Sequence, residues 1–142
     1  MKYIISFTAV VTIILLAFTI KYLDYKETYN DIKKYNIEYE MYLNKLITGR
    51  ELTTVINKAV DNNEKNKVSK DKNGFYLDDN ENSINIDVKI LDNDTTYKME
   101  TFYSGGMISF IQYYGDISFE CTKIEYNSKG KVKYMVFEQK VN

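Results

Sequence analysis

The sequence predicts an α+β fold, with a long N-terminal transmembrane and stalk helix, a second amphipathic helix, and a small antiparallel sheet of about four strands with one further short helix. Three observations lead to this prediction. Residues 3–20 form an uncharged apolar stretch, residues 52–60 carry apolar side chains at helical spacing, and residues 84–90 alternate apolar with polar side chains. In chain order they give a transmembrane anchor (1–22), a helical stalk (23–47) and a small α+β domain (48–142).

The apolar stretch is long enough to cross a bilayer. At about 1.5 Å per residue, its helix would span roughly 27 Å, close to the apolar thickness of a membrane. Lys2-Tyr3 and Lys21-Tyr22 bracket it, and such pairs suit the two membrane interfaces. We interpret the stretch as an uncleaved signal anchor. A cleaved signal peptide is the alternative, but Ala17-Phe18-Thr19 is a poor cleavage site, and the absence of a Cys after the stretch excludes a lipoprotein anchor.

The lysine distribution and the short leader favour opposite orientations of the domain. Lysines are more numerous after the stretch than before it, which by the positive-inside rule would place the domain in the cytoplasm. The short leader nevertheless resembles that of an export-type signal anchor, and Asp24, Glu27 and Asp31 intersperse the later lysines. We therefore expect a single-pass protein of the cell membrane with an extracytoplasmic domain.

A heptad pattern continues from the anchor into the stalk, because seam positions from Val11 to Leu46 recur at alternating steps of four and three. No Gly or Pro interrupts residues 2–48, so one continuous helix of roughly 70 Å is expected. The stripe is either a parallel coiled-coil seam in which Asn36 fixes the register, or a face that packs onto the chain's own domain. The candidate interaction seam consists of Tyr25, Tyr29, Ile32, Asn36, Tyr39 and Leu43.

The first half of the domain begins with a capping box, in which Thr48 and Glu51 can satisfy each other's backbone amides and start a helix. Residues 61–63 mark the end of this helix. A turn at residues 71–74 places Gly74 where a positive φ is needed. The strand at 84–90 is then followed by a turn at Asp92, Asn93 and Asp94 and by a partner strand over residues 97–101.

The second half contains a short helix over residues 107–114 with Gly115 as its C-cap. A strand over residues 117–126 follows, and its alternation slips near Thr122 as a β-bulge would cause. Residues 127–130 form a hairpin turn, and Val132, Tyr134 and Val136 begin the last strand. Because hairpins dominate, we expect an antiparallel sheet with helices covering one face.

Composition argues against several function classes. The 19 Lys and Arg residues nearly balance the 20 Asp and Glu residues, so nucleic acid is not an expected partner. The chain has no His, the commonest general base and metal ligand. Its one cysteine, Cys121, falls in an apolar alternating segment, where a thiol is usually buried and inert. We expect neither enzymatic activity nor a cofactor.

Acidic clusters at residues 78–82 and 92–94 could supply oxygen ligands to a hard cation. Neither matches a calcium-binding loop, because Ser83 takes the place of the required Gly in the first and the closing Glu is absent from both. We expect them to be turns stabilised by their own backbone and assign no metal site. Ser104-Gly105-Gly106 before a helix is too weak a signal for a phosphate site.

Residues 48–59, 119–126 and 136–139 resemble segments of uncharacterised single-pass membrane proteins from low-GC Gram-positive bacteria. This resemblance implies a bacterial, membrane-anchored protein and brings no catalytic residues with it. The layout is also similar to that of pilins and pseudopilins, in which a long N-terminal helix is half membrane span and half packed on an antiparallel sheet. The prepilin processing site, a Gly followed by a hydrophobic segment with Glu at its fifth position, is absent.

The expected function is that of a membrane-anchored, non-enzymatic structural or protein-interaction module. Its N-terminal helix would contact the lipid bilayer, and the rest would bind another protein or a second copy of the chain. A pilin-like subunit of a surface or secretion assembly is one alternative. A ligand- or ion-sensing extracytoplasmic domain, using Asp78, Asp79 and Glu81, is the other.

Overall fold

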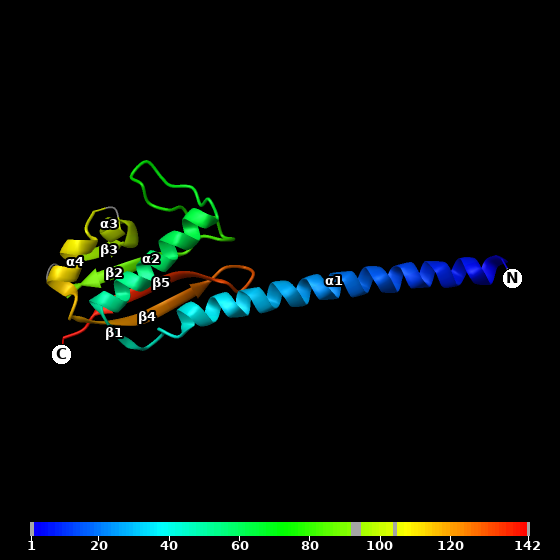
Figure 1. Cartoon of the computed structure of the whole chain (residues 1–142), viewed down its shortest axis with the longest axis horizontal. Helices are drawn as coiled ribbons and strands as arrows, with labels where there is room; N and C mark the ends of the chain where they lie inside the picture. The colour runs from blue at the N-terminus through cyan, green and yellow to red at the C-terminus, as the bar shows by residue number, and fades with distance from the viewer. Residues whose placement is uncertain (1, 92–94, 104, 142) are drawn as a thin grey trace. The chain divides into compact units, whose positions relative to one another are not determined.

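The computed structural model describes residues 2–91, 95–103 and 105–141 (Figure 1). The chain divides into two compact units, Met1–Lys34 and Tyr35–Asn142. The second unit therefore begins within the stalk rather than at residue 48, and it includes the end of the first helix.

Helix α1 spans Lys2–Glu40 and contains the apolar stretch. Within the described residues, it is the one helix long and apolar enough to cross a membrane. The prediction that the stalk is helical to residue 47 is wrong at its end. The helix stops at Glu40, Asn44 takes a positive φ of 57°, and Leu46–Thr48 forms strand β1. Pairing of these residues with a neighbouring strand overrides their helical pattern.

Helix α2 spans Gly49–Lys65 and starts with the predicted capping box. The Thr48 N–H donates to Glu51 Oε2 at 2.8 Å, and the Glu51 N–H donates to Thr48 Oγ1 at 3.2 Å. These bonds satisfy amides that the first helical turn would leave unpaired, and the bonds from Thr48 hold the pKa of the Glu51 carboxyl below its ordinary value. Five apolar residues of one face are fully buried: Leu52, Val55, Ile56, Ala59 and Val60.

The sheet confirms the α+β class but is mixed. Its five strands lie in the order β1-β4-β5-β2-β3. Strands β2 (Asn85–Ile90) and β3 (Thr95–Lys98) form one antiparallel pair, and β4 (Ser118–Tyr126) and β5 (Val132–Gln139) form another. The expectation of about four purely antiparallel strands is wrong, because β1 adds a fifth strand at one edge and β5 runs parallel to β2.

Two short helices lie between the hairpins, where the sequence predicted one. The expected helix is α4, Met107–Tyr114, and Gly115 is its C-cap. The other helix, α3, spans Met99–Tyr103, so the predicted strand does not extend past Lys98. Burial explains this difference, since Met99 and Phe102 both reach the core from one helical face. The predicted turn at Asp92, Asn93 and Asp94 lies outside the described residues.

The predicted turn and bulge signals are confirmed. The pairing of β4 with β5 shifts register between Cys121 and Lys123, which places a bulge at Thr122. Gly74 and Gly130 take positive φ values of 85° and 78° in their turns.

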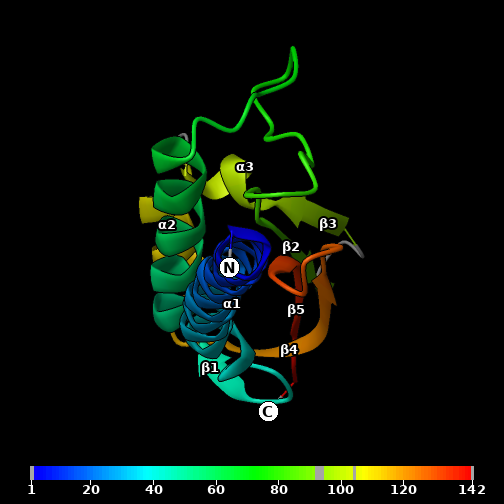
Figure 2. The ribbon, with the colours of Figure 1, turned by 90° about the vertical axis from the view of Figure 1, so that its right-hand side faces the viewer.

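One face of the sheet forms the core. Figure 2 shows α2 on this side of the sheet, and residues of α3 and α4 belong to the same buried cluster. Phe119, Cys121, Met135 and Phe137 point into it at the alternate positions that the strand pleat provides. The opposite face is polar, and ion pairs such as Lys89 with Glu138 cross it from strand to strand.

Candidate interaction surfaces

The apolar part of α1 is the first candidate surface. Its large apolar side chains between Phe7 and Leu23 are exposed on every side of the helix, so no part of the described chain covers them. Exposed apolar surface of this extent is unfavourable in water but favourable in hydrocarbon. A single long apolar helix of this kind is compatible with a membrane anchor. The side chains of Lys2 and Tyr3, predicted to lie at one interface, are outside the described part of the structure.

The predicted seam does not form one continuous surface. Tyr25 and Tyr29 have exposed fractions of 70% and 56%, and Ile32 is half-buried. Asn36, by contrast, is buried in the domain. Its Nδ2 donates to the Gly130 carbonyl at 2.8 Å, and its Oδ1 accepts from the Val132 N–H at 2.9 Å. The Asn36 amide therefore binds the start of β5, so in this structure it is not available to face a second helix.

Tyr39 also belongs to the domain core. It is 2% exposed, its ring centroid lies 5.0 Å from that of Tyr35, and burial raises the pKa of its hydroxyl to about 12. Tyr42 continues this contact beyond the helix, with its ring edge against Phe137 of β5. Leu43 lies after the helix end and forms an isolated bridge with Cys121. For Asn36 and Tyr39, the structure thus favours packing onto the chain's own domain.

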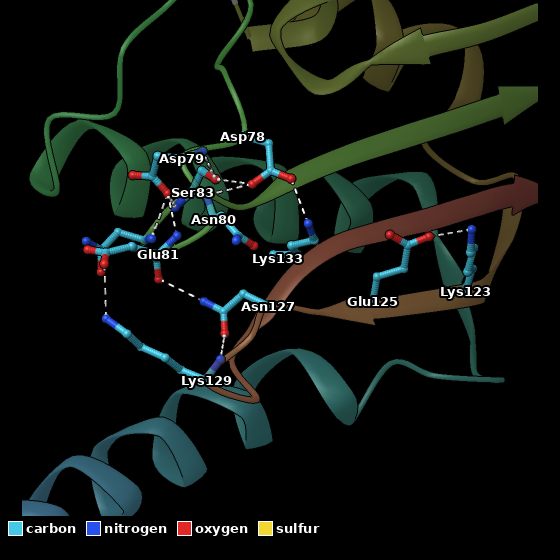
Figure 3. Close-up of polar contacts among 11 residues, drawn as sticks. Asp78, Asp79, Asn80, Glu81, Ser83, Lys123, Glu125, Asn127, Lys129 and Lys133 are labelled. Atoms are coloured by element: carbon cyan, nitrogen blue, oxygen red, sulfur yellow. Dashed lines mark hydrogen bonds and ion pairs between the residues drawn. The ribbon is translucent and has the colours of Figure 1, made fainter.

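The loop before β2 contains the acidic cluster considered as a cation site (Figure 3). Asp79 Oδ1 accepts three backbone N–H bonds, from Glu81 at 2.9 Å and from Asn82 and Ser83 at 2.8 Å each. Partial burial raises the pKa of Asp79, but the hydrogen bonds to its charged form together outweigh that effect and lower the pKa to about 2. The carboxylate therefore holds the loop's own backbone.

The neighbouring acids of this loop bind lysines of the β4–β5 hairpin. Lys133 Nζ lies 2.7 Å from Asp78 Oδ2, and this bond keeps the pKa of Asp78 below its ordinary value. Lys129 Nζ lies 3.2 Å from Glu81 Oε1, and Asn127 donates to the Glu81 carbonyl (Figure 3). Among the described residues, no group of three or more Cys, Asp or Glu side chains is arranged to hold a metal. A cation here would have to displace lysines and backbone amides.

A groove of about 360 Å³ lies beside this loop, a feature that the sequence pattern did not predict. Aromatic and charged residues share its lining, and most of the charged groups already have partners. Asp78 pairs with Lys133, and Asp71 Oδ1 accepts from the Asn73 and Phe75 amides. A small polar molecule could enter the groove, but its acids are already bound by protein donors.

Cys121 is not an activated nucleophile. Its side chain is fully buried in β4, and burial raises the pKa of the thiol to about 11, so it is protonated at neutral pH. The predicted buried, structural cysteine is thus confirmed. Ser104, considered as part of an anion site, lies outside the described residues.

No family model, no curated protein and no solved structure matches this chain.

Proposed function

We propose that this chain is a single-pass, membrane-anchored and non-enzymatic protein-interaction module. Helix α1 would lie in the cell membrane, with the domain on the extracytoplasmic side. This proposal is based on two parts of α1 that differ in burial. Its apolar segment is exposed throughout, whereas Asn36 and Tyr39 of the same helix are buried in the domain. The apolar segment and the buried residues Asn36 and Tyr39 therefore lie on one continuous helix.

The chemistry of the described residues supports a non-enzymatic role. The sequence has no His, and the Cys121 thiol is buried and protonated. Asp78, Asp79 and Glu81 bind lysines and backbone amides rather than facing a cleft with one another. Nucleophilic and general-base catalysis need an activated group beside a substrate site, and these groups do not supply one.

Membrane extraction tests the anchor. The full chain should sediment with membranes, resist alkaline carbonate and be released by detergent, because its apolar helix partitions into hydrocarbon. Recovery in the soluble fraction after cell lysis would overturn the proposal.

Trypsin added to intact cells tests the orientation. Lys67 and Lys72 are exposed in the segment between α2 and β2, and they offer cleavage sites outside the sheet. With the domain outside the cytoplasm, cleavage should proceed in intact cells. Protection until the cells are lysed would place the domain in the cytoplasm instead.

A pilin-like subunit is the second candidate. It is favoured by one observation, the contact of the α1 end and of Tyr42 with strand β5, which matches the layout of a helix packed along a sheet. This candidate predicts filaments or a secretion-associated complex by electron microscopy of expressing cells. Their absence would argue against it.

A ligand- or ion-sensing domain is the third candidate, and the groove beside Asp78 is the observation that favours it. Calorimetric titration of the full chain in detergent with Ca²⁺ tests its ion-sensing form. Because the loop acids already bind protein donors, we expect no binding heat.

A further inference from the structure

A short aromatic stripe on α1 lies beyond the apolar stretch. It consists of Tyr22, Tyr25, Tyr29 and Ile32, which recur at steps of three and four and so share one helix face. We call these four residues the tyrosine stripe. All of it lies within the first unit, and its three tyrosines are exposed. Tyr25 and Tyr29 follow Lys21, the first charged residue after the apolar stretch, so hydrocarbon does not cover them.

The lysines and the acidic residues around the stripe lie on different sides of the helix. With about 100° of rotation per residue, Lys26 and Lys33 lie roughly 70° from the midline of the stripe, and Lys21 lies roughly 60° from it on the other side. The acids lie on the opposite face, with Asp24 and Asp31 at roughly 130° and Glu27 at roughly 170°. The stripe is therefore bordered by lysines on both sides.

These lysines have no carboxylate partner in the described part of the chain. The ion pairs there all join residues between Glu38 and Lys140, and none includes a residue of the first unit. Their positive charge therefore remains available to a partner that covers the stripe.

A second copy of the chain fits this surface poorly. In a pair of parallel helices, the residues that border the two seams face each other across the interface. Two copies would bring Lys21 of one toward Lys26 of the other, and like charges at such positions repel. A helix with acidic residues at the same positions would be attracted instead.

We propose that the tyrosine stripe binds a partner helix anchored in the same membrane, with an apolar or aromatic seam bordered by Asp and Glu, rather than a second copy of this chain. This inference rests on the proposed membrane-anchored interaction function. Sharing a membrane with the same topology makes the two helices parallel and restricts their encounter to two dimensions, so a short seam can suffice.

Disulfide crosslinking in membranes tests the proposal, with a charge-reversed copy of the full chain as the acidic partner. One copy carries Tyr25→Cys alone. The other carries Tyr25→Cys with Lys21→Glu, Lys26→Glu and Lys33→Glu, and the two carry different tags. Cys121 is buried and adds no accessible thiol, and the chain without Tyr25→Cys is the blank. Trypsin accessibility confirms that both copies have the same topology.

With equal amounts of the two copies, random pairing would make half of all crosslinked pairs mixed. We expect the mixed fraction to be larger than one half. At low ionic strength mixed pairs should outnumber pairs of the lysine-bordered copy by about fivefold or more, and salt should reduce this excess because it screens exposed charges. Equal crosslinking of the lysine-bordered copy with itself would overturn the proposal in favour of a second copy. No crosslinking in any mixture would show that the stripe does not pair with a helix.

Lys26 and Lys34 provide a matched control, since only Lys26 borders the stripe and would lie opposite Lys21 of a second copy. Lys26→Glu should increase crosslinking to the lysine-bordered copy, and Lys34→Glu, on the opposite face, should not. Equal effects of the two changes would count against the proposal. Carbonate extraction of every variant is read separately. Retention in the membrane with no preference for mixed pairs refutes only this inference, whereas loss from the membrane refutes the proposed function.

Discussion

At the scale of single residues, asparagine side chains form the hydrogen bonds that a neighbouring strand would otherwise make with backbone N–H and C=O groups. Asn36 binds the start of β5, and Asn127 Oδ1 accepts the amides of Lys129 and Lys131 in the hairpin turn. Asn63 does the same for β2: it donates to the Ile84 carbonyl at 2.7 Å and accepts from the Ile84 N–H at 2.8 Å. An amide carries both a donor and an acceptor, so one side chain satisfies both groups of a residue that has no strand beside it.

Asn63→Leu should destabilise the domain by about 2–4 kcal/mol, because the buried N–H and C=O of Ile84 would lose their partners. Thermal unfolding of the full chain in detergent measures the effect. Asn57→Leu, at an exposed position of the same helix, should change stability by less than about 0.5 kcal/mol. Similar losses for both variants would show that the Ile84 bonds are not the cause.

The Asp79 carboxylate predicts a defined pH dependence. Its pKa falls from an ordinary 3.8 to about 2 on folding, so its stabilising contribution is complete above pH 3.8 and is lost as the pH falls toward 2. Asp79→Asn removes the charge but keeps the side-chain shape. The melting-temperature difference between the wild type and this variant should therefore be largest near neutral pH and shrink between pH 4 and 2. A difference that stayed constant over this range would contradict the assigned role of the charge.

At the scale of elements, α1 combines an exposed apolar segment with residues that are buried in the domain. Its apolar segment should fail to insert when carboxylates are placed in its centre, at a cost of about 3 kcal/mol for each one. Val11→Asp combined with Ile14→Asp should shift the protein from the membrane to the soluble fraction after carbonate extraction. Leu23→Asp combined with Ile37→Asp, at exposed positions beyond the centre, should remain in the membrane. Equal release of both double variants would contradict the assigned span.

Local signals predicted the elements that depend on neighbouring residues. The capping box fixed the start of α2, and slipped alternation located the bulge at Thr122. Strand β1 was missed because three residues are too few to show alternation, and α3 because Tyr97, Met99 and Thr101 alternate like a strand. The parallel pairing of β2 with β5 depends on contacts such as that of Asn85 with Tyr134, which are distant in sequence.

The candidate surfaces were predicted less completely. Cys121 was expected to be buried, because its strand pattern alternates. The spacing of Asn36 with its neighbours fits both a coiled-coil seam and a helix that packs on its own domain. Only its hydrogen bonds to Gly130 and Val132 show that it packs on the domain. The groove beside Asp78 combines residues from five separate parts of the chain, so no local pattern indicates it.

At the scale of the whole molecule, the compact second unit begins at Tyr35 and has its own core. Residues 35–142 expressed alone should therefore fold and remain soluble, with a cooperative thermal transition by circular dichroism. Residues 48–142 should be markedly less stable, because they lack Asn36, the buried Tyr39 and Ile47, and most of β1. Equal melting temperatures would show that the end of α1 adds nothing to the domain.

The position of β5 in the sheet affects the order of events during synthesis. Strand β5 follows the other four strands in the chain, yet it lies at the centre of the sheet between β4 and β2. The ribosome must therefore make every other strand before the one that joins the two hairpins. The apolar segment of α1 emerges long before that moment. If α1 is the membrane anchor that we propose, the chain reaches the membrane before β5 completes the sheet, so no complete sheet has to be unfolded for the domain to cross it.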